Sequence, residues 1–483
     1  MDTKELKNKT IRSIVALTGR QMISQVITLL TLIPLGLFLS PTALGTFIAV
    51  SSITPFFNFF VDLGLGSALI QKKTEPTETD LRTVFTVQLL IVSAIIVVGL
   101  LLSGPISSFS RLTPDGITLY KVLLFVLFIS SLKSIPSILM ERRIAFERQI
   151  IPSIIEQFVY SFVIVFLAIK GFEVKSYSWA FFISALVGLP IYYLLSPWRI
   201  SLGLSRDSLK TLLSYGVLYQ SKTFLSLIKD NLLTIFLSGL PGVGTYGLGQ
   251  IGWWQRWAYS PYSFIVNSVT KVTFPTYSRV QDDKVRLRAG IERSLYLVSL
   301  VMFPCLTVMM VLISKILVLF PKYSVWSDGL PAFYFFCAGA GISAMSGILV
   351  NTLDATGHVK TTSVLMAFWI LLIWPLTIIM VNLYGFNGVA VAPFLVSLTV
   401  GLTAFLVNRI VKFDFLGSFL KPLFASVVMA GGMVVIGKMT PVNVFTVILT
   451  GATGAIIYLV TVWLIDREKL MDNARVILFA FKK

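Results

Sequence analysis

Long apolar stretches, each about the length of a bilayer-spanning helix, follow one another along almost the entire chain. A helix needs roughly 20 residues to cross the hydrocarbon core, and by this measure the pattern predicts about fourteen membrane-spanning helices. Their expected ranges are 11–39, 43–70, 82–104, 117–140, 149–170, 176–197, 210–239, 244–273, 289–318, 330–353, 360–382, 387–409, 415–437 and 443–465. The connections are short and leave no room for a soluble catalytic or nucleotide-binding domain. The pattern therefore predicts an all-α integral membrane protein.

Composition agrees with this class and narrows the chemistry. Of the 483 residues, 56% are hydrophobic and only 13% are charged, whereas soluble domains average about 25% charged residues. Cys305 and Cys337 lie within apolar runs, and the one histidine, His358, stands in a short loop. No Gly-rich loop followed by Lys and Ser/Thr, the pattern that cradles a nucleotide phosphate, is found. We therefore expect no metal, no other cofactor and no direct use of ATP.

Basic residues are distributed unequally between the two sides of the predicted membrane. The loops on the N-terminal side carry 28 of the 40 Lys and Arg, the opposite loops carry seven, and five lie within predicted spans. By the positive-inside rule, this bias places both termini in the cytoplasm. The basic loops on the cytoplasmic side also account for the net charge of +18. We therefore expect no nucleic-acid partner.

Short motifs recur in the two halves of the chain. Gly45–Phe47 opens the second predicted span and Gly244–Tyr246 the eighth, while Gly171 precedes the sixth span as Gly385–Gly388 precedes the twelfth. An even number of helices separates the equivalents, so the halves share one orientation, as in the parallel repeats of transporters. We predict two six-helix lobes around a central cavity. The expected domains are 1–209 for the first lobe, 210–414 for the second, and 415–483 for an appended helix pair and tail.

Five basic side chains fall inside predicted spans, where charges are costly. Each costs roughly 2.5–3.5 kcal/mol at mid-bilayer, on the order of 12–17 kcal/mol together. Such a cost indicates function, and we predict that these residues line a water-filled cavity and bind an anionic substrate. They are Arg20, Lys133, Lys222, Lys229 and Arg256. The planar guanidinium of arginine can donate two parallel hydrogen bonds to phosphate oxygens, and lysine supplies a compact positive charge. Both residue types therefore suit a diphosphate.

Three acidic residues within the spans leave a second interpretation open. Asp62, Glu156 and Asp230 could carry a coupling ion or form structural ion pairs. The expected pairs are Arg20 with Asp62, Lys133 with Glu156, and Lys229 with Asp230. For any one pair a structural role is as reasonable as a functional one. Five cations against three carboxylates nevertheless leave two positive charges in excess.

Aromatic residues surround Arg256 in the eighth predicted span. Trp253, Trp257 and Tyr259 lie within one helical turn of it, and aromatic faces stack on the C–H surfaces of sugar rings. The same residue types also form the belts that line membrane interfaces. The sequence predicts sugar stacking by these three side chains and leaves interfacial packing as the alternative.

Three motifs, taken in order, resemble those of a known family. Asp62–Gln71 resembles the end of its second helix, Pro241–Tyr246 the entry to its eighth, and Gly385–Ala392 its twelfth. The chain is similar over nearly its whole length to the polysaccharide exporters and O-antigen flippases of the multidrug/oligosaccharidyl-lipid/polysaccharide (MOP) superfamily. The resemblance implies a MATE-like fold with a cationic cavity. It also implies translocation of polyprenyl-diphosphate-linked oligosaccharide across the bacterial inner membrane, driven by an ion gradient or the membrane potential.

The same resemblance bears on the site residues and partners. It implies that Arg20, Lys222 and Arg256 contact the diphosphate, because their helices line the family's cavity. Lys133 and Lys229 match no fixed position of the family. The implied partners are the lipid-linked oligosaccharide, membrane lipids and the polysaccharide polymerase machinery. The product would serve O-antigen, capsule or exopolysaccharide synthesis, and no covalent chemistry is implied.

Three other functions fit parts of the pattern. A flippase of the peptidoglycan lipid precursor would share the helix number and the cationic cavity. A drug/cation antiporter would favour acidic cavity residues over this basic excess. A membrane polysaccharide polymerase or ligase would need a substantial outward loop to hold its active site, and no predicted connection is that long.

Overall fold

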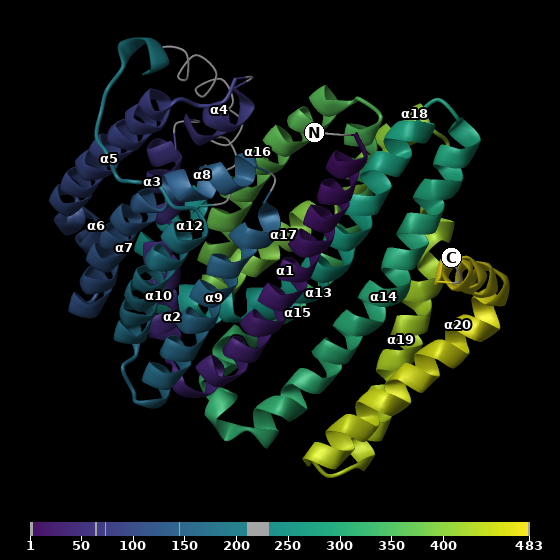
Figure 1. The fold of residues 1–483 in the computed structure, drawn as a ribbon. Helices are drawn as coiled ribbons and strands as arrows, with labels where there is room; N and C mark the ends of the chain where they lie inside the picture. Colours follow the sequence, from purple (N-terminus) through teal and green to yellow (C-terminus); the bar gives the residue numbers. More distant parts are fainter. Residues whose placement is uncertain (1–2, 63–64, 73, 144, 210–230, 482–483) are drawn as a thin grey trace. The chain divides into compact units, whose positions relative to one another are not determined.

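Helices account for all the regular structure in the described part of the chain (Figure 1). The computed structural model describes residues 3–62, 65–72, 74–143, 145–209 and 231–481. These residues fold into two compact units, one that extends to Gly249 and one that begins at Gln250. The prediction of an all-α protein is confirmed. The finer division into lobes at 209 and 414 stays a prediction.

The first unit consists of helices that pack mainly on their neighbours in sequence. The helices are α1 (Thr3–Phe38), α2 (Pro41–Ser51), α3 (Thr54–Asp62), α4 (Leu65–Gln71), α5 (Glu78–Leu101), α6 (Ser103–Phe109), α7 (Pro114–Leu132), α8 (Ser134–Arg142), α9 (Phe146–Ile169), α10 (Val174–Leu195) and α12 (Leu233–Gly239). The central packing involves α9, which lies against both α1 and α10, and α7, which lies against α5 and α10. The start of α13 (Gly244–Val280) also belongs to this unit.

Several of these helices begin at residues that satisfy the first free backbone N–H groups. Thr77 and Asp80 form a reciprocal capping box at the start of α5, and the Thr113 hydroxyl accepts from Gly116 N with Pro114 in the first helical position. Ser40 caps α2 in the same way, and its own N–H and hydroxyl donate to Glu173 Oε2. Such caps are worth about 1 kcal/mol each, and the Glu173 contact also joins the starts of α2 and α10.

Some predicted spans are interrupted in the structure. The span expected over 43–70 is interrupted between α2 and α3, the span expected over 117–140 between α7 and α8, and the span expected over 387–409 at residues 398–399. The second break lies at Lys133, whose N–H donates to Ser130 O, the bond of a tightened final turn.

The second unit continues the series of long helices. They are α13, α14 (Lys284–Leu319), η2 (Pro321–Gly329), α15 (Leu330–Ala355), α16 (Val359–Tyr384), η3 (Gly385–Asn387), α17 (Gly388–Ser397), α18 (Val400–Ile410), α19 (Phe415–Met439) and α20 (Val444–Phe481). Figure 1 shows α19 and α20 side by side, and α19 also lies along α14. The α20 helix bends sharply at Asp466, where Lys421 of α19 pairs with the Asp466 carboxylate at 2.6 Å.

Eleven helical segments in the described residues are long and apolar enough to cross a membrane. One of them, Val359–Ile410, contains two of the predicted spans. The α13 helix is long enough but is not among the eleven, and most of the span predicted over 210–239 lies outside the described residues. These findings are consistent with the predicted helix number and confirm a multi-pass membrane protein.

Candidate substrate-binding site

The clearest charged site in the first unit is a buried ion pair between Lys133 and Glu156. The break between α7 and α8 presents Lys133, and the middle of α9 presents Glu156, so that Nζ and Oε1 lie 2.6 Å apart. The Lys133 side chain is 11% exposed and that of Glu156 is 23% exposed. The pair predicted from the sequence is therefore present. At this burial, removal of either partner alone would leave an uncompensated charge.

A glycine on α10 makes room for this pair. A Cβ atom at Gly188 would overlap the Glu156 carboxylate, so only glycine lets α10 approach α9 at this point. One turn later, the Tyr192 ring lies 5.6 Å from Lys133 Nζ, a distance that suits a cation–π contact. The neighbouring Tyr193 hydroxyl donates to Leu132 O at 2.8 Å and holds α10 against the end of α7.

Arg20 belongs to the same group of residues. It is exposed on α1, and both Arg20 and Glu156 interact electrostatically with the Tyr192 hydroxyl. One turn further along α1, Ser24 donates to Gln157 Oε1 at 2.5 Å, and Gln157 Nε2 donates back to Ser24 O at 2.9 Å. This reciprocal contact fixes α1 on α9. We call Arg20, Lys133, Glu156 and Tyr192 the N-unit cluster.

The other predicted charges fall into two groups. Arg256 lies on α13 in the second unit, with its side chain exposed. Lys222, Lys229 and Asp230 lie outside the described residues, as does the side chain of Asp62. The predicted pairs of Arg20 with Asp62 and of Lys229 with Asp230 therefore stay predictions.

The three aromatic residues predicted to stack on sugars differ in their surroundings. Trp253 is buried, its ring stacks on Trp326 at a centroid distance of 4.5 Å, and it meets the half-buried Trp257 edge-on. Tyr259 is half-buried and lies edge-on to Phe336. Trp253 therefore packs against η2, a role that the sequence did not predict. Nothing in these contacts tests sugar stacking by Trp257 or Tyr259.

The contacts of α13 with η2 extend beyond Trp253. Gln250 donates through Nε2 to Val325 O and accepts from Gly329 N through Oε1, and Trp254 Nε1 donates to Trp326 O at 2.8 Å. These three bonds hold the η2 segment on the α13 helix. The residues Gln255 and Arg256, which follow Trp254, are exposed.

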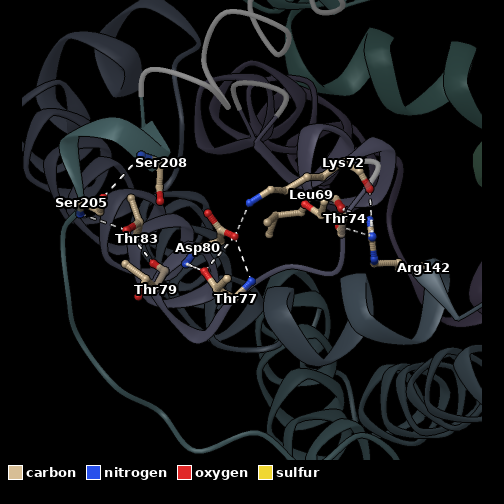
Figure 2. Close-up of polar contacts among 10 residues, drawn as sticks. All are labelled: Leu69, Lys72, Thr74, Thr77, Thr79, Asp80, Thr83, Arg142, Ser205 and Ser208. Carbon is tan, nitrogen blue, oxygen red and sulfur yellow. Dashed lines mark hydrogen bonds and ion pairs between the residues drawn. The ribbon is translucent and has the colours of Figure 1, made fainter.

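A second polar network lies at the start of α5 (Figure 2). The Arg142 guanidinium donates to four backbone carbonyls, those of Leu69, Ile70, Lys72 and Thr74. These carbonyls belong to the end of α4 and the residues after it, where a helix has no acceptor partners of its own. Lys72 pairs with Asp80 at 2.5 Å, and Asp80 also accepts from Thr77.

The segment that follows α10 is fastened to the same end of α5. Gly203 N donates to the Thr86 hydroxyl and Ser205 N donates to the Thr83 hydroxyl, each at 3.0 Å. The sequence did not predict this network. Its one signal in the sequence was the spacing of Thr77 and Asp80, which is typical of a capping box.

Among the residues that the structure describes, no group of three or more His, Cys, Asp or Glu side chains could hold a metal ion. The charged side chains of the N-unit cluster are an ammonium, a guanidinium and a carboxylate group, of which Lys133 and Glu156 form an ion pair.

Comparison with known proteins places these observations in a family. A family model described as "Polysaccharide biosynthesis protein" matches residues 35–328. An uncharacterized membrane protein in the cps region of Klebsiella pneumoniae is 28% identical over 316 residues, and the match spans only 62% of that protein's length and 62% of this chain. Succinoglycan biosynthesis transport protein ExoT of Rhizobium meliloti (strain 1021) is 24% identical over 476 residues, 91% of this chain and 90% of that protein.

A likeness to a solved structure extends to the whole fold. The lipid II flippase MurJ, in an inward closed conformation, superposes with a TM-score of 0.75 at 17% identity, and the match covers 95% of this chain and 100% of that one. At this identity the likeness concerns the fold alone. The fold class predicted from the sequence is confirmed.

Proposed function

Because this chain belongs to the family of polysaccharide biosynthesis proteins, we propose that it translocates a polyprenyl-diphosphate-linked oligosaccharide across the bacterial inner membrane. A relative that aligns with nine-tenths of the chain is a succinoglycan biosynthesis transport protein. The proposed route is alternating access, in which the head group enters a cavity while the polyprenyl tail stays in lipid. The product supplies surface polysaccharide synthesis, and no covalent bond is made or broken.

The physical task is to keep a diphosphate away from hydrocarbon. An unpaired charge in the bilayer centre costs several kcal/mol, so the carrier must supply cations along the path. The observation that carries the proposal is the N-unit cluster, in which the Tyr192 ring lies 5.6 Å from the buried Lys133 Nζ and the Tyr192 hydroxyl interacts electrostatically with the exposed Arg20. We propose Arg20 and Lys133 as diphosphate contacts in the first unit. Arg256, Lys222 and Lys229 are the proposed contacts from the rest of the chain.

The proposed roles of the other predicted residues follow from the same picture. Glu156 releases Lys133 when the diphosphate arrives, and Trp257 and Tyr259 contact the sugars. By the distribution of basic residues, both termini face the cytoplasm. Polymerase machinery on the outer side of the membrane would receive the translocated unit.

A transport assay with purified protein tests this function. The protein is reconstituted into vesicles that contain fluorescent polyprenyl-diphosphate-linked oligosaccharide, and translocation is followed by quenching from outside. Arg20→Ala should abolish translocation, because the exposed guanidinium is lost without a change in packing. Lys121→Ala, which removes an exposed charge from α7 outside the cluster, is the matched control. Transport at the normal rate by Arg20→Ala would remove Arg20 from the site.

The likeness of fold to MurJ adds a second arm to the same assay. Vesicles that carry the peptidoglycan lipid precursor in place of the oligosaccharide lipid are tested in parallel. The proposed function predicts translocation of the oligosaccharide lipid and little of the precursor. Translocation of the precursor with little of the oligosaccharide lipid would instead make the chain a flippase of the peptidoglycan lipid precursor.

A further inference from the structure

The α1 helix has two exposed faces of opposite character. Met22, Val26 and Leu30 repeat every four residues along one face, and each side chain is more than half exposed. Arg20 and Thr28 are exposed on the opposite face. All five residues lie within the first apolar span. Lipid can cover the apolar face but would leave the polar groups unsatisfied, so the polar face of α1 borders a water-filled space.

The α9 helix, which packs on α1, is divided in the same way. Phe158, Phe162 and Phe166 form an exposed apolar stripe along it. Gln157 is half-buried and lies on another side of the helix, where its amide contacts Thr28 of α1. Both residues stand near the middle of their spans, which run from Gly19 to Phe38 and from Glu147 to Ile169. A polar contact therefore lies at the depth of the hydrocarbon core.

Gln157 and Thr28 use their hydrogen-bond donors on one another and on Ser24. Gln157 Oε1 accepts from the Ser24 hydroxyl at 2.5 Å, and Gln157 Nε2 donates to Ser24 O at 2.9 Å and to Thr28 Oγ1 at 3.2 Å. The Thr28 hydroxyl donates its own hydrogen to Ser24 O at 2.8 Å. Within the described residues, one lone pair of Gln157 Oε1 and one of Thr28 Oγ1 still have room for a hydrogen bond.

Two acceptors without spare donors select the chemistry of a ligand. A diphosphate offers only acceptor oxygens, so it gains no hydrogen bond from them. A sugar hydroxyl carries a hydrogen that it can donate to either atom, and neutral amide and hydroxyl groups commonly fix the orientation of a bound ligand. Thr28 lies eight residues beyond Arg20, about 12 Å along the α1 axis.

We propose that Thr28 and Gln157 form a sugar subsite, in which Thr28 Oγ1 and Gln157 Oε1 accept hydrogen bonds from hydroxyl groups of the translocated head group. The inference rests on the proposed function, in which Arg20 on the same face of α1 contacts the diphosphate. The sugars next to the diphosphate then lie along α1 between Arg20 and Thr28. Ser24 orients the Gln157 amide for this role through its two hydrogen bonds.

Binding of two lipids that differ only in the head group tests the subsite. The purified protein is titrated in detergent with polyprenyl-diphosphate-linked oligosaccharide and with sugar-free polyprenyl diphosphate, and the readout is the ratio of the two affinities. Thr28→Val and Gln157→Leu should each lower the preference for the oligosaccharide lipid about three- to tenfold, the effect of one lost hydrogen bond. Thr28→Ser keeps the hydroxyl and should retain the ratio of the parent.

The ratio separates a sugar contact from a mere structural clamp of α1 on α9, because a clamp would affect both lipids alike. Arg20→Ala should weaken the binding of both lipids to a similar degree. Thr118→Val is the matched control and should change neither affinity, since it removes an exposed hydroxyl that bonds to its own helix, α7. An unchanged ratio in Thr28→Val or in Gln157→Leu would contradict the subsite.

The same titration distinguishes failure of the subsite from failure of the proposed function. Equal affinity of the unmodified protein for the two lipids would overturn the subsite and leave the translocation of a diphosphate lipid in place. Absence of binding to either lipid would overturn both proposals.

Discussion

At the scale of single residues, the pairing of Lys133 with Glu156 was predictable, and the way it is achieved was not. A carboxylate within an apolar span has few partners, so a lysine in a neighbouring span is the natural one. The contribution of Gly188 depends on how closely α10 approaches α9, which no pattern along one helix reveals. The same holds for Trp253, whose stacking on Trp326 depends on the fold of η2.

The double-mutant cycle of Lys133 and Glu156 decides whether this pair is a structural ion pair or takes part in transport, the two roles that the sequence left open. Lys133→Met alone should destabilise the protein by about 3–5 kcal/mol, because it leaves the Glu156 carboxylate buried and unpaired. Lys133→Met with Glu156→Met should recover most of that loss. Thermal unfolding in detergent measures the stability of each variant.

Translocation by the same double variant then gives the answer. If Lys133 contacts the diphosphate, the double variant is stable but translocates slowly. A stable double variant with normal translocation would show that the pair is structural only. The Lys121→Ala protein again provides the reference for loss of an exposed lysine.

At the scale of the helices, the positions of most spans were predictable because lipid demands long apolar segments. The interruptions were not predicted, although Pro55 and Pro136, each three residues after a break, are residues that disturb helices. Hydropathy does not report where a helix tightens or bends. The α13 helix shows the converse, because its range was expected as a span although the helix is not among the eleven segments that are apolar enough to cross a membrane.

The Arg142 contacts make a prediction about α4. Arg142→Ala removes four charge-assisted hydrogen bonds from the end of this short helix, at a cost of roughly 2 kcal/mol or more. Hydrogen exchange of the α4 amides should therefore accelerate. Arg142→Lys should restore little, because one ammonium group cannot reach the carbonyls that the planar guanidinium serves.

Arg143→Ala is the control for this prediction, since Arg143 is the exposed neighbour in sequence. Equal protection of α4 in the Arg142→Ala protein and the parent would show that the four bonds contribute nothing to its stability.

At the scale of the whole molecule, the distribution of basic residues predicts which ends of the helices face the cytoplasm. Ser108→Cys should react with an impermeant maleimide from the outside, and Asp282→Cys only after the membrane is opened. Both side chains are exposed in the structure, so a difference in reactivity reports the side of the membrane. The measurement compares labelling of intact cells and permeabilised cells in the background without native cysteines. The opposite pattern would invert the topology.

The approach of α10 to α9 at Gly188 has one more consequence, which concerns how this molecule can evolve. No amino acid is smaller than glycine, so every replacement at 188 adds atoms where the Glu156 carboxylate already lies. Natural variation there can therefore separate the two helices but never bring them closer together. Any lineage that acquires a larger residue at 188 must also change the residue at 156.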